Sequence, residues 1–375
     1  MMDYNQAWLM LTRIKGLGFT RITNLLIHFD SVENIFNQSN YPNHLNIPKV
    51  VQNLLKNPVL SLIKDDLKWL EEENNSILAI DNDLYPPLLK KTDSPPPLLF
   101  ITGNPNVLLM PQLAVVGSRN ASSVGLRNTQ SFCHDLAKKG VTITSGMALG
   151  VDGKAHNAAL LAGGQTIAVM GTGLDVVYPA KHRELAHNIA KNGALVSEFP
   201  IGTKPNAHNF PRRNRIICGL SMGTLVMEAS IKSGTLITAR QTMEINRPVM
   251  AIPGSIHSPM AKGCHLLIKQ GAKLVESAEE ILEELTPLAQ SLSIEIKEKL
   301  SLLDNNTVKN SKNPYIKDEN NDHQMVLKLI SFEATPIDEI IEKSGLKAQE
   351  VASILLILEL EDKIQALSGA QYIRI

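Results

Sequence analysis

The chain has 375 residues, of which 43% are hydrophobic, and its 37 Lys/Arg balance 37 Asp/Glu to a formal net charge of zero. This is the composition of an ordinary globular protein, and the length suffices for two or three domains. The three cysteines are odd in number and far apart, which excludes a disulfide framework. No signal peptide is evident, and no apolar stretch approaches the roughly 18–20 residues that span a bilayer. We therefore expect a cytoplasmic protein without membrane association.

Residues 1–75 show the apolar spacing of helices and are predicted to form an N-terminal helical domain. The pattern breaks at Ile14-Lys15-Gly16-Leu17-Gly18, which resembles a helix-hairpin-helix turn. Such a turn can present backbone N–H groups to a DNA phosphate. Two glycines between helices also occur as an ordinary packing turn, and the sequence leaves both interpretations open.

Residues 76–109 are predicted to be a connecting segment. Pro86-Pro87 and Pro95-Pro96-Pro97 make it a poor helix or central strand, because proline fixes φ and lacks an N–H donor. Residues 98–101 are expected to continue as extended chain into the next domain.

Residues 110–285 alternate between short apolar runs and helical segments. Strands are predicted near residues 113–116, 141–144, 166–170, 195–197, 224–227, 249–252 and 272–275, and helices include 123–139 and 152–162. Alternation of this kind is typical of a parallel sheet covered on both faces. The predicted fold class is α/β, a Rossmann-like, doubly wound, mostly parallel sheet.

The C-terminal part divides into two segments. Residues 286–322 are polar and are predicted to be a linker that is partly disordered. Residues 323–375 contain three helical segments and two short strands around Ser368-Gly369, an arrangement that resembles a winged helix.

The zero net charge conceals a basic centre. From Met110 to Val275 there are 18 Lys/Arg and 7 Asp/Glu, a surplus of 18 − 7 = +11, and the rest of the chain carries 19 − 30 = −11. A basic body attracts polyanions through its long-range field. The alternative is that these charges are spread evenly and only keep the domain soluble.

Turns rich in glycine and hydroxyl groups follow the predicted strands, where ligands of such sheets bind. Glycine lets the backbone approach an anion closely, and the helix N-termini that follow direct free N–H groups at it. Basic residues occur at the same ends of the sheet. The turns and the basic residues are Gly117-Ser118-Arg119, Ser145-Gly146, Gly171-Thr172-Gly173, Lys181, Arg183 and Ser233-Gly234-Thr235.

The run Asn209-Phe210-Pro211-Arg212-Arg213-Asn214-Arg215 concentrates three arginines and one aromatic residue. Guanidinium groups bind phosphate oxygens through paired N–H donors, and an aromatic ring can stack on an unpaired base. These residues suit a nucleic acid strand, although a solvated basic loop would have the same composition. No Walker A pattern occurs, and Gly171-Thr172-Gly173 lacks the third glycine of a dinucleotide fingerprint, so we expect no cofactor.

The strand ends and the arginine run together resemble the DNA-processing protein A family, also called Smf. The similarity lies in residues 114–119, 145–152, 171–179 and 210–217, and continues through 233–240 and 253–256. It implies single-stranded DNA binding without catalysis, protection of incoming DNA, and loading of the recombinase RecA during natural transformation. It also implies a homodimer, with a single-stranded DNA-binding protein as a further partner.

The resemblance and the strand ends together give the expected sites. The predicted nucleic-acid-binding residues are Gly117, Ser118, Arg119, Gly146, Lys181, Arg183, Phe210, Arg212, Arg213, Asn214, Arg215, Ser233, Gly234 and Thr235. The predicted dimer interface comprises Cys264, His265, Leu267, Ile268 and Leu274.

Three alternatives remain. Gly223-Thr224 followed by Glu228 is similar to the signature of the Lonely Guy phosphoribohydrolases, although the paired glycines are missing. Asp152 and His156, with His182 and His187 nearby, could hold a hydrolytic metal, but we expect no metal: Asp152 would cap its helix and His156 would be a hydrogen-bonded surface histidine. A pure scaffold would not explain the central arginines.

Overall fold

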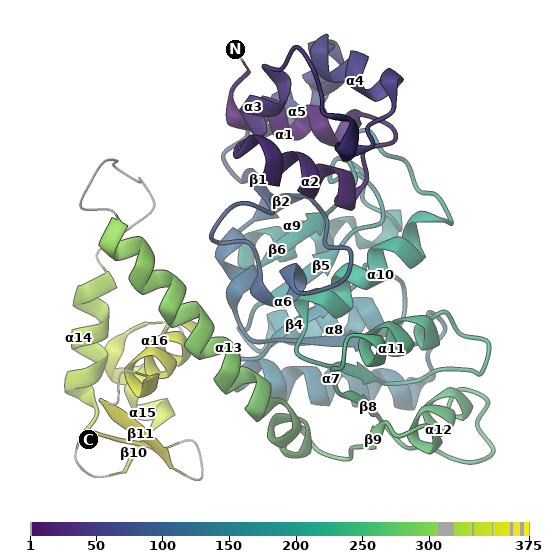
Figure 1. Ribbon diagram of the computed structural model, residues 1–375. Coiled ribbons are helices and arrows are strands. Elements are labelled where there is room, and N and C mark those ends of the chain that lie inside the picture. The colour runs from purple at the N-terminus through teal and green to yellow at the C-terminus, as the bar shows by residue number, and fades with distance from the viewer. Residues whose placement is uncertain are drawn as a thin grey trace.

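The computed structural model describes residues 2–306, 319–331, 334–346, 348–360, 363–367 and 371–374. A cluster of helices lies at one end of a nine-stranded sheet, and a small three-stranded module follows near the C-terminus (Figure 1). The order of elements confirms the predicted fold class: a mostly parallel α/β sheet, N-terminal helices and a C-terminal winged helix. Within the described residues, no helix is both long and apolar enough to cross a bilayer.

The N-terminal residues are helical, as predicted. A capping box begins the first helix, because the Asp3 carboxylate accepts from the Gln6 N–H and the Gln6 side chain accepts from the Asp3 N–H. Gly16 has a φ of +94°, so the turn after this helix requires glycine. The helices are α1 (Tyr4–Arg13), α2 (Phe19–Phe29), α3 (Val32–Phe36), η1 (Asn43–Leu45), α4 (Lys49–Lys56), η2 (Leu60–Ile63) and α5 (Lys64–Leu70).

The segment predicted to be a connection belongs to the sheet. Strands β1 (Asn75–Ala79) and β2 (Leu98–Gly103) pair antiparallel, and β2 also pairs antiparallel with β6 (Ala194–Ser197). The short helix α6 (Pro87–Lys90) and the prolines lie between the two strands, where no ladder hydrogen bond is needed from them. The expectation that this segment would not supply an inner strand is therefore wrong for β2, which has a neighbour on each side.

The remaining strands pair in parallel in the order β6-β5-β4-β3-β7-β8-β9, so the sheet reverses its winding at β3. Their bounds are β3 (Gln112–Val116), β4 (Thr142–Ser145), β5 (Thr166–Val169), β7 (Thr224–Val226), β8 (Val249–Ala251) and β9 (Lys273–Leu274). All seven agree with the predicted strands to within a few residues. The connecting elements are η3 (Pro105–Leu109), α7 (Ser123–Lys138), α8 (Val151–Leu161), η4 (Ala180–His182), α9 (Arg183–Asn192), α10 (Asn209–Leu220), α11 (Thr235–Glu244) and α12 (Lys262–Lys269).

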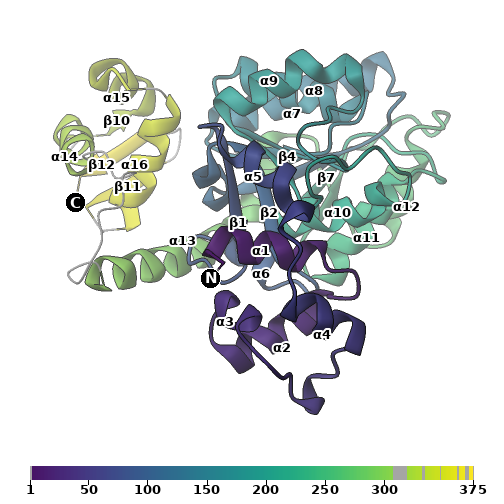
Figure 2. The same cartoon turned by 90° about the horizontal axis from the view of Figure 1, so that it is seen from above.

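Helices cover both faces of this sheet, with α7, α8 and α9 on one side and α10 and α11 on the other (Figure 2). Side chains of β3 alternate between the two layers. Leu113 and Val115 pack with α7 and α8, whereas Ala114 and Val116 belong to the clusters on the opposite face. Each strand thus ends between two layers of helices, which places its carboxyl end at the mouth of a crevice.

The predicted linker is helical over its first part, because α13 (Ala278–Asn306) continues through residues 286–306. Residues 307–318 lie outside the described residues. The C-terminal module has the strand order β10-β12-β11 and buries Val326, Ile340 and Leu355 in its own core. Its elements are α14 (Glu319–Leu329), β10 (Thr335–Pro336), α15 (Ile337–Ser344), α16 (Ala348–Leu360), β11 (Ile364–Leu367) and β12 (Gln371–Arg374).

Candidate nucleic-acid interface

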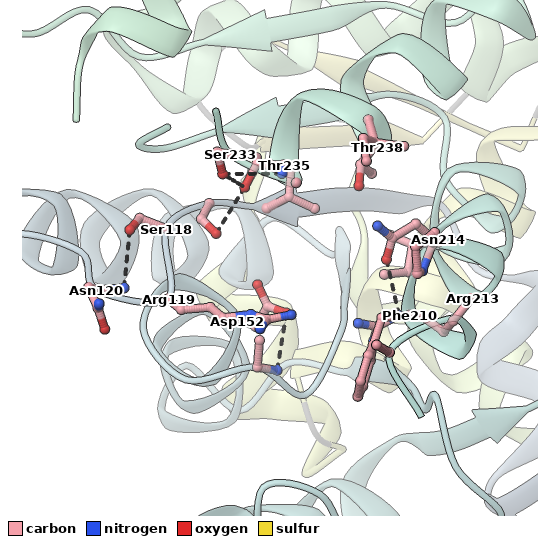
Figure 3. A pocket seen from close by; sticks show the side chains of 18 of the residues that line it. Ser118, Arg119, Asn120, Asp152, Phe210, Arg213, Asn214, Ser233, Thr235 and Thr238 are labelled. Atoms are coloured by element: carbon pink, nitrogen blue, oxygen red, sulfur yellow. Dashed lines mark hydrogen bonds between the residues drawn. The ribbon is translucent and has the colours of Figure 1, made fainter. Parts of the chain in front are cut away.

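A cavity of about 780 Å³ opens at the carboxyl ends of β3 and β7, where the sheet reverses its winding. The N-terminal turns of α8, α10 and α11 reach it from three directions (Figure 3). Among its lining residues are Gly117, Ser118, Arg119, Asn120, Asp152, Tyr178, Asn206, Phe210, Arg213, Asn214, Ser233, Gly234, Thr235 and Thr238. Three helix N-termini favour an anion here through the positive ends of their dipoles. Their N–H groups are less available than the sequence predicts, because those of Val151, Asn209 and Thr235 already donate within the protein.

Close backbone packing beside β3 requires two glycines. Gly150 has a φ of +80°, and a side chain there would collide with the carbonyl oxygens of Ser118 and Arg119. A side chain at Gly117 would collide with Val151 at the start of α8. The Val151 N–H donates to the Ser118 carbonyl over 3.2 Å. These contacts hold the Gly117–Arg119 turn against α8 and leave the Arg119 side chain exposed at the mouth of the cavity.

Arg213 and Asp152 form a buried pair of opposite charges in the wall of the cavity, with only 6% and 7% of their surfaces exposed. Burial raises the pKa of Asp152 and lowers that of Arg213, while the charge of each partner acts in the opposite direction. Arg213 also donates to the Val169 carbonyl, and Asp152 accepts from the Ala148 N–H over 3.2 Å. A side chain at Gly146 would collide with both charged groups. Gly146 therefore supports the pair from behind and is buried, rather than lining the cavity.

An aromatic pair lies beside the two arginines. The rings of Phe210 and Tyr178 are 5.8 Å apart, and the guanidinium carbon of Arg119 lies 5.8 Å from the centroid of the Phe210 ring. Both rings line the main cavity and an adjoining recess of about 150 Å³. Phe210 is half-buried and Tyr178 is 49% exposed, so part of each ring is open to a ligand. A cation next to aromatic faces suits a phosphate with an unpaired base.

Hydroxyl groups form the side of the cavity at α11. The Ser233 hydroxyl donates to Thr235 Oγ1 over 2.9 Å and accepts from the Thr235 N–H over 3.2 Å. Thr235 Oγ1 in turn donates to the Gly117 carbonyl over 3.1 Å, which ties the α11 turn to the end of β3. The cavity-lining residues of the prediction thus come together from three separate turns of the chain.

Two of the predicted arginines lie elsewhere. Arg215 forms an ion pair with Glu198 and donates to the Ser94 carbonyl, and Arg212 lies 3.5 Å from the same carboxylate. Both line a separate cavity of about 250 Å³ together with Phe19 of the N-terminal helices. Lys181 and Arg183 are exposed but line neither the main cavity nor the adjoining recess. Lys181, Arg183, Arg212 and Arg215 therefore do not line the cavity that Arg119 lines.

Several lining residues were not predicted. Asn120, Asn206 and Thr238 are polar and sit on turns or a helix face, and Tyr178 is an aromatic residue at the rim. Tyr178 stands beside Pro179 in a chain with only 6 tyrosines, which was the available signal. Asn206 and Thr238 carry no local signal, because only the tertiary fold brings residues 206 and 238 to the end of β3.

The residues considered as metal ligands form hydrogen bonds within the protein instead. His156 is fully buried rather than at the surface, with Nε2 2.6 Å from the Gly146 carbonyl and Nδ1 2.6 Å from Thr166 Oγ1. Burial lowers its pKa to about 4. Asp152 binds the N–H of Ala148, ahead of its helix, and the N-cap position belongs to Gly150. Among the described residues, no group of three or more His, Cys, Asp or Glu side chains could hold a metal.

Glu228, the carboxylate of the phosphoribohydrolase alternative, serves a structural role. It accepts from the Ser122 N–H over 2.8 Å and from the Ser122 hydroxyl over 2.6 Å. Ser122 caps α7 by accepting from the Gly125 N–H. A negative charge at this position stabilises the N-terminus of α7. Glu228 does not line the main cavity.

The predicted dimer residues divide into core and surface. Cys264 and Leu267 are buried in the cluster that joins α12 to the sheet, so their side chains cannot form an interface. Burial also raises the pKa of the Cys264 thiol. His265 and Ile268 are partly buried, and Leu274 on the edge strand β9 is 42% exposed.

Comparison with known proteins agrees with this architecture. The sequence model of the family described as DNA recombination-mediator protein A matches residues 76–286, and that of the DprA winged helix domain matches residues 311–370. The chain is 44% identical over 314 residues to Protein Smf of Escherichia coli, which covers 84% of this chain and 81% of that protein. It is 46% identical over 206 residues to DNA processing protein DprA of Streptococcus pneumoniae, or 55% of this chain and 73% of that one.

Solved structures show the same relationship. The crystal structure of DprA from Streptococcus pneumoniae superimposes with a TM-score of 0.61 at 35% identity, covering 76% of this chain and 98% of that one. DNA processing protein A from Helicobacter pylori, a structure described for its single-stranded DNA binding mode, gives a TM-score of 0.52 at 28% identity and covers 58% and 96%. With family models spanning the sheet and the winged helix, and a relative aligned over most of both chains, this chain belongs to the DprA/Smf family of DNA recombination-mediator proteins.

Proposed function

We propose that the cavity at the ends of β3 and β7 binds single-stranded DNA without chemical conversion. One observation supports this most directly: Arg119 is exposed 5.8 Å from the centre of the Phe210 ring, at a mouth formed by helix N-termini. The guanidinium and the positive ends of the helix dipoles suit a phosphate, and the ring suits an unstacked base. The Helicobacter pylori relative, described for binding single-stranded DNA, supports the same assignment.

Membership of the DprA/Smf family supports a proposal for the cellular role. We propose that the protein protects incoming DNA strands in the cytoplasm and loads RecA on them during natural transformation. It would act as a homodimer and also interact with a single-stranded DNA-binding protein. After exclusion of the buried Cys264 and Leu267, the proposed dimer surface consists of His265, Ile268 and Leu274 near the β9 edge. An unpaired edge strand offers a row of backbone groups to a second copy.

Salt dependence tests the strand site. Binding of labelled oligo(dT) and of a matched duplex is measured by fluorescence anisotropy across a salt series. Log K should fall linearly with log salt, and the duplex should bind less tightly because its paired bases cannot reach the Phe210 ring. Arg119→Ala should weaken all sequences alike and lower the slope for single strands by about 0.7, the loss of one phosphate contact.

Arg212→Ala provides the matched control. Arg212 is 64% exposed but lies in the separate cavity with Glu198, so its removal should change the affinity less than twofold. Binding that ignores salt, or an Arg212→Ala loss equal to that of Arg119→Ala, would contradict the proposed site.

A further inference from the structure

The N-terminal helices and the cavity share one loop. Residues 198–208 connect β6 to α10, and their distal part (Pro205, Asn206 and Ala207) lines the cavity. Their proximal part packs on the N-terminal helices, since Ile201 belongs to the same hydrophobic cluster as Trp8 and Trp69. The loop therefore touches the N-terminal domain at one end and the candidate ligand at the other.

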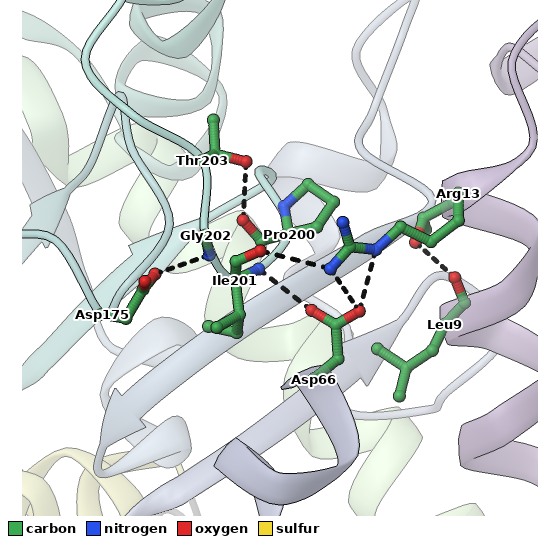
Figure 4. A network of polar contacts seen from close by, with 9 residues as sticks. Leu9, Arg13, Asp66, Asp175, Pro200, Ile201, Gly202 and Thr203 are labelled. Carbon is green, nitrogen blue, oxygen red and sulfur yellow. Dashed lines mark hydrogen bonds and ion pairs between the residues drawn. The ribbon is translucent and has the colours of Figure 1, made fainter. Parts of the chain in front are cut away.

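A buried carboxylate fastens the proximal end (Figure 4). Asp66 of α5 is completely buried, and its Oδ2 accepts from Nε and Nη2 of Arg13 over 2.9 and 2.6 Å. Its Oδ1 accepts from the Ile201 N–H over 3.0 Å, and Arg13 Nη2 also donates to the Ile201 carbonyl over 3.2 Å. The backbone N–H and C=O of Ile201 are thus both bound by the Arg13–Asp66 pair of α1 and α5. Because both oxygens of the buried Asp66 carboxylate accept hydrogen bonds, removing either partner should lower the stability of these contacts.

Further hydrogen bonds carry this constraint toward the cavity. The Gly202 N–H donates to Asp175 over 3.0 Å, and the Gly173 N–H donates to the Thr203 carbonyl over 3.0 Å. Beyond Thr203, the Asn206 carbonyl accepts from the Asn209 N–H at the start of α10 over 3.0 Å. Asn209 Nδ2 donates to the Gly171 carbonyl over 3.1 Å. The loop is therefore fixed at both ends, and Phe210 follows its second anchor directly.

We propose that the N-terminal helical domain positions the strand-binding loop through Asp66 and Arg13, which act as positioning residues for the cavity without touching the ligand. This inference rests on the proposed function of the cavity for its affinity readout. Loosening Ile201 removes one of the anchors of the loop and leaves the others, so the Asn206 wall and the N-terminus of α10 become less well preorganised. A bound strand then has to order them, which lowers its affinity.

The test uses Asp66→Asn in the full chain. Each oxygen of Asp66 accepts a hydrogen bond, and an Asn amide group cannot accept on both sides, so either Arg13 or the Ile201 N–H loses its acceptor. Oligo(dT) should bind about twofold to thirtyfold more weakly. Hydrogen exchange of residues 199–208 should accelerate in the free protein, while the amides of β4 and β5 stay protected.

Tyr41→Phe is the matched control, because it removes a buried hydrogen bond inside the N-terminal domain, from the Tyr41 hydroxyl to the Ile35 carbonyl over 2.7 Å. It should leave both oligo(dT) affinity and exchange of residues 199–208 unchanged. Arg13→Lys is the milder second variant, since Lys keeps the charge but cannot donate to Asp66 and the Ile201 carbonyl through one planar fork. It should show a smaller change in the same direction.

The outcomes separate the two proposals. If Asp66→Asn and Arg13→Lys keep wild-type exchange in residues 199–208, or if Tyr41→Phe weakens binding as much as they do, the positioning role is wrong. If the wild-type protein does not bind oligo(dT), the proposed function fails, and loop exchange in the free protein still decides whether Asp66 orders the loop.

Discussion

Replacing Asp152 with Asn should lower the stability of the protein and raise its affinity for single-stranded DNA. The charged side chains lining the cavity are Arg119, Arg213 and Asp152, a net charge of 2 − 1 = +1. Asp152→Asn raises this to +2 and leaves Arg213, which is 6% exposed, without its counter-charge. Breaking a directly bonded buried ion pair from one side costs about 3–5 kcal/mol of folding free energy. Asp152 and Arg213 interact through their charges without a direct ion-pair contact, and the amide oxygen can still accept from the Ala148 N–H, so a loss at or below the lower end of that range is expected.

The effect on binding has the opposite sign. In the wild type, a phosphate about 8 Å from the Asp152 carboxylate would be repelled by about 2 kcal/mol at an effective dielectric constant of about 20, and Asp152→Asn removes this repulsion. Oligo(dT) should therefore bind about thirtyfold more tightly at low salt, with a smaller gain at physiological ionic strength. The strand should also raise the melting temperature of the variant by more than that of the wild type, because it supplies the missing negative charge.

Urea unfolding and fluorescence anisotropy measure the two quantities on the same preparations. Asp135→Asn on α7 is the control, since Asp135 is 52% exposed and lies outside the cavity lining. It removes the same charge from the protein and should alter neither quantity appreciably. Weaker or unchanged oligo(dT) binding by folded Asp152→Asn would refute the reasoning, because it would mean that no phosphate comes near this pair.

Two further predictions concern single residues. Phe210→Ala should reduce oligo(dT) affinity by about 1–3 kcal/mol and reduce duplex affinity much less, measured by anisotropy; equal losses for both would place the ring outside the strand path. His156 has a pKa of about 4 when folded, so the unfolded chain binds more protons below its ordinary value of 6.5. Its contribution is present above pH 6.5 and is lost as the pH falls toward 4, about 3 kcal/mol in all. Urea unfolding across this range should show a shallower pH dependence in His156→Gln, and an identical dependence would mean that other groups are responsible.

Much of the central sheet could be predicted from the sequence, because buried parallel strands appear as short apolar runs that end in glycine or hydroxyl residues. Strand β1 was missed although Ile77 and Leu78 are apolar, since it pairs with β2 across an intervening proline-rich segment and carries no turn signal of a hairpin. The first part of the predicted linker differs from the expected disorder, because it continues helix α13, and Leu288, Ala289 and Leu292 pack in the same cluster as Ile281 and Leu285. In each case, contacts distant in sequence determined the local structure.

Two of the predicted dimer residues lie in the core for a related reason. Cys264 and Leu267 lie three residues apart on α12, and this spacing marks one helix face without saying what that face contacts. In the structure they pack on β7 and α11. An apolar helix face predicted from sequence can pack in the core of its own domain or form an interface with another chain. A continuous apolar stripe along the helix favours packing in the core. The exposure of the Leu274 side chain could have been predicted, because Leu274 belongs to the last predicted strand, and the last strand added on one side of a doubly wound sheet forms its edge.

The residues of the arginine run were predicted to form one binding site, but helix α10 directs them to two different cavities. With 3.6 residues per turn, positions i, i+3, i+4 and i+7 share a face. Phe210, Arg213, Asn214 and Ile217 line the main cavity, whereas Arg212 and Arg215 line the other one beside Glu198. The same rule would have divided them in the sequence, had the run been taken as a helix rather than a loop. Since Arg213 is buried against Asp152, Arg119 is the one arginine at this cavity that is exposed to an incoming phosphate. The salt dependence should therefore reflect fewer phosphate contacts than three neighbouring arginines suggest, and the difference between Arg119→Ala and Arg212→Ala measures this directly.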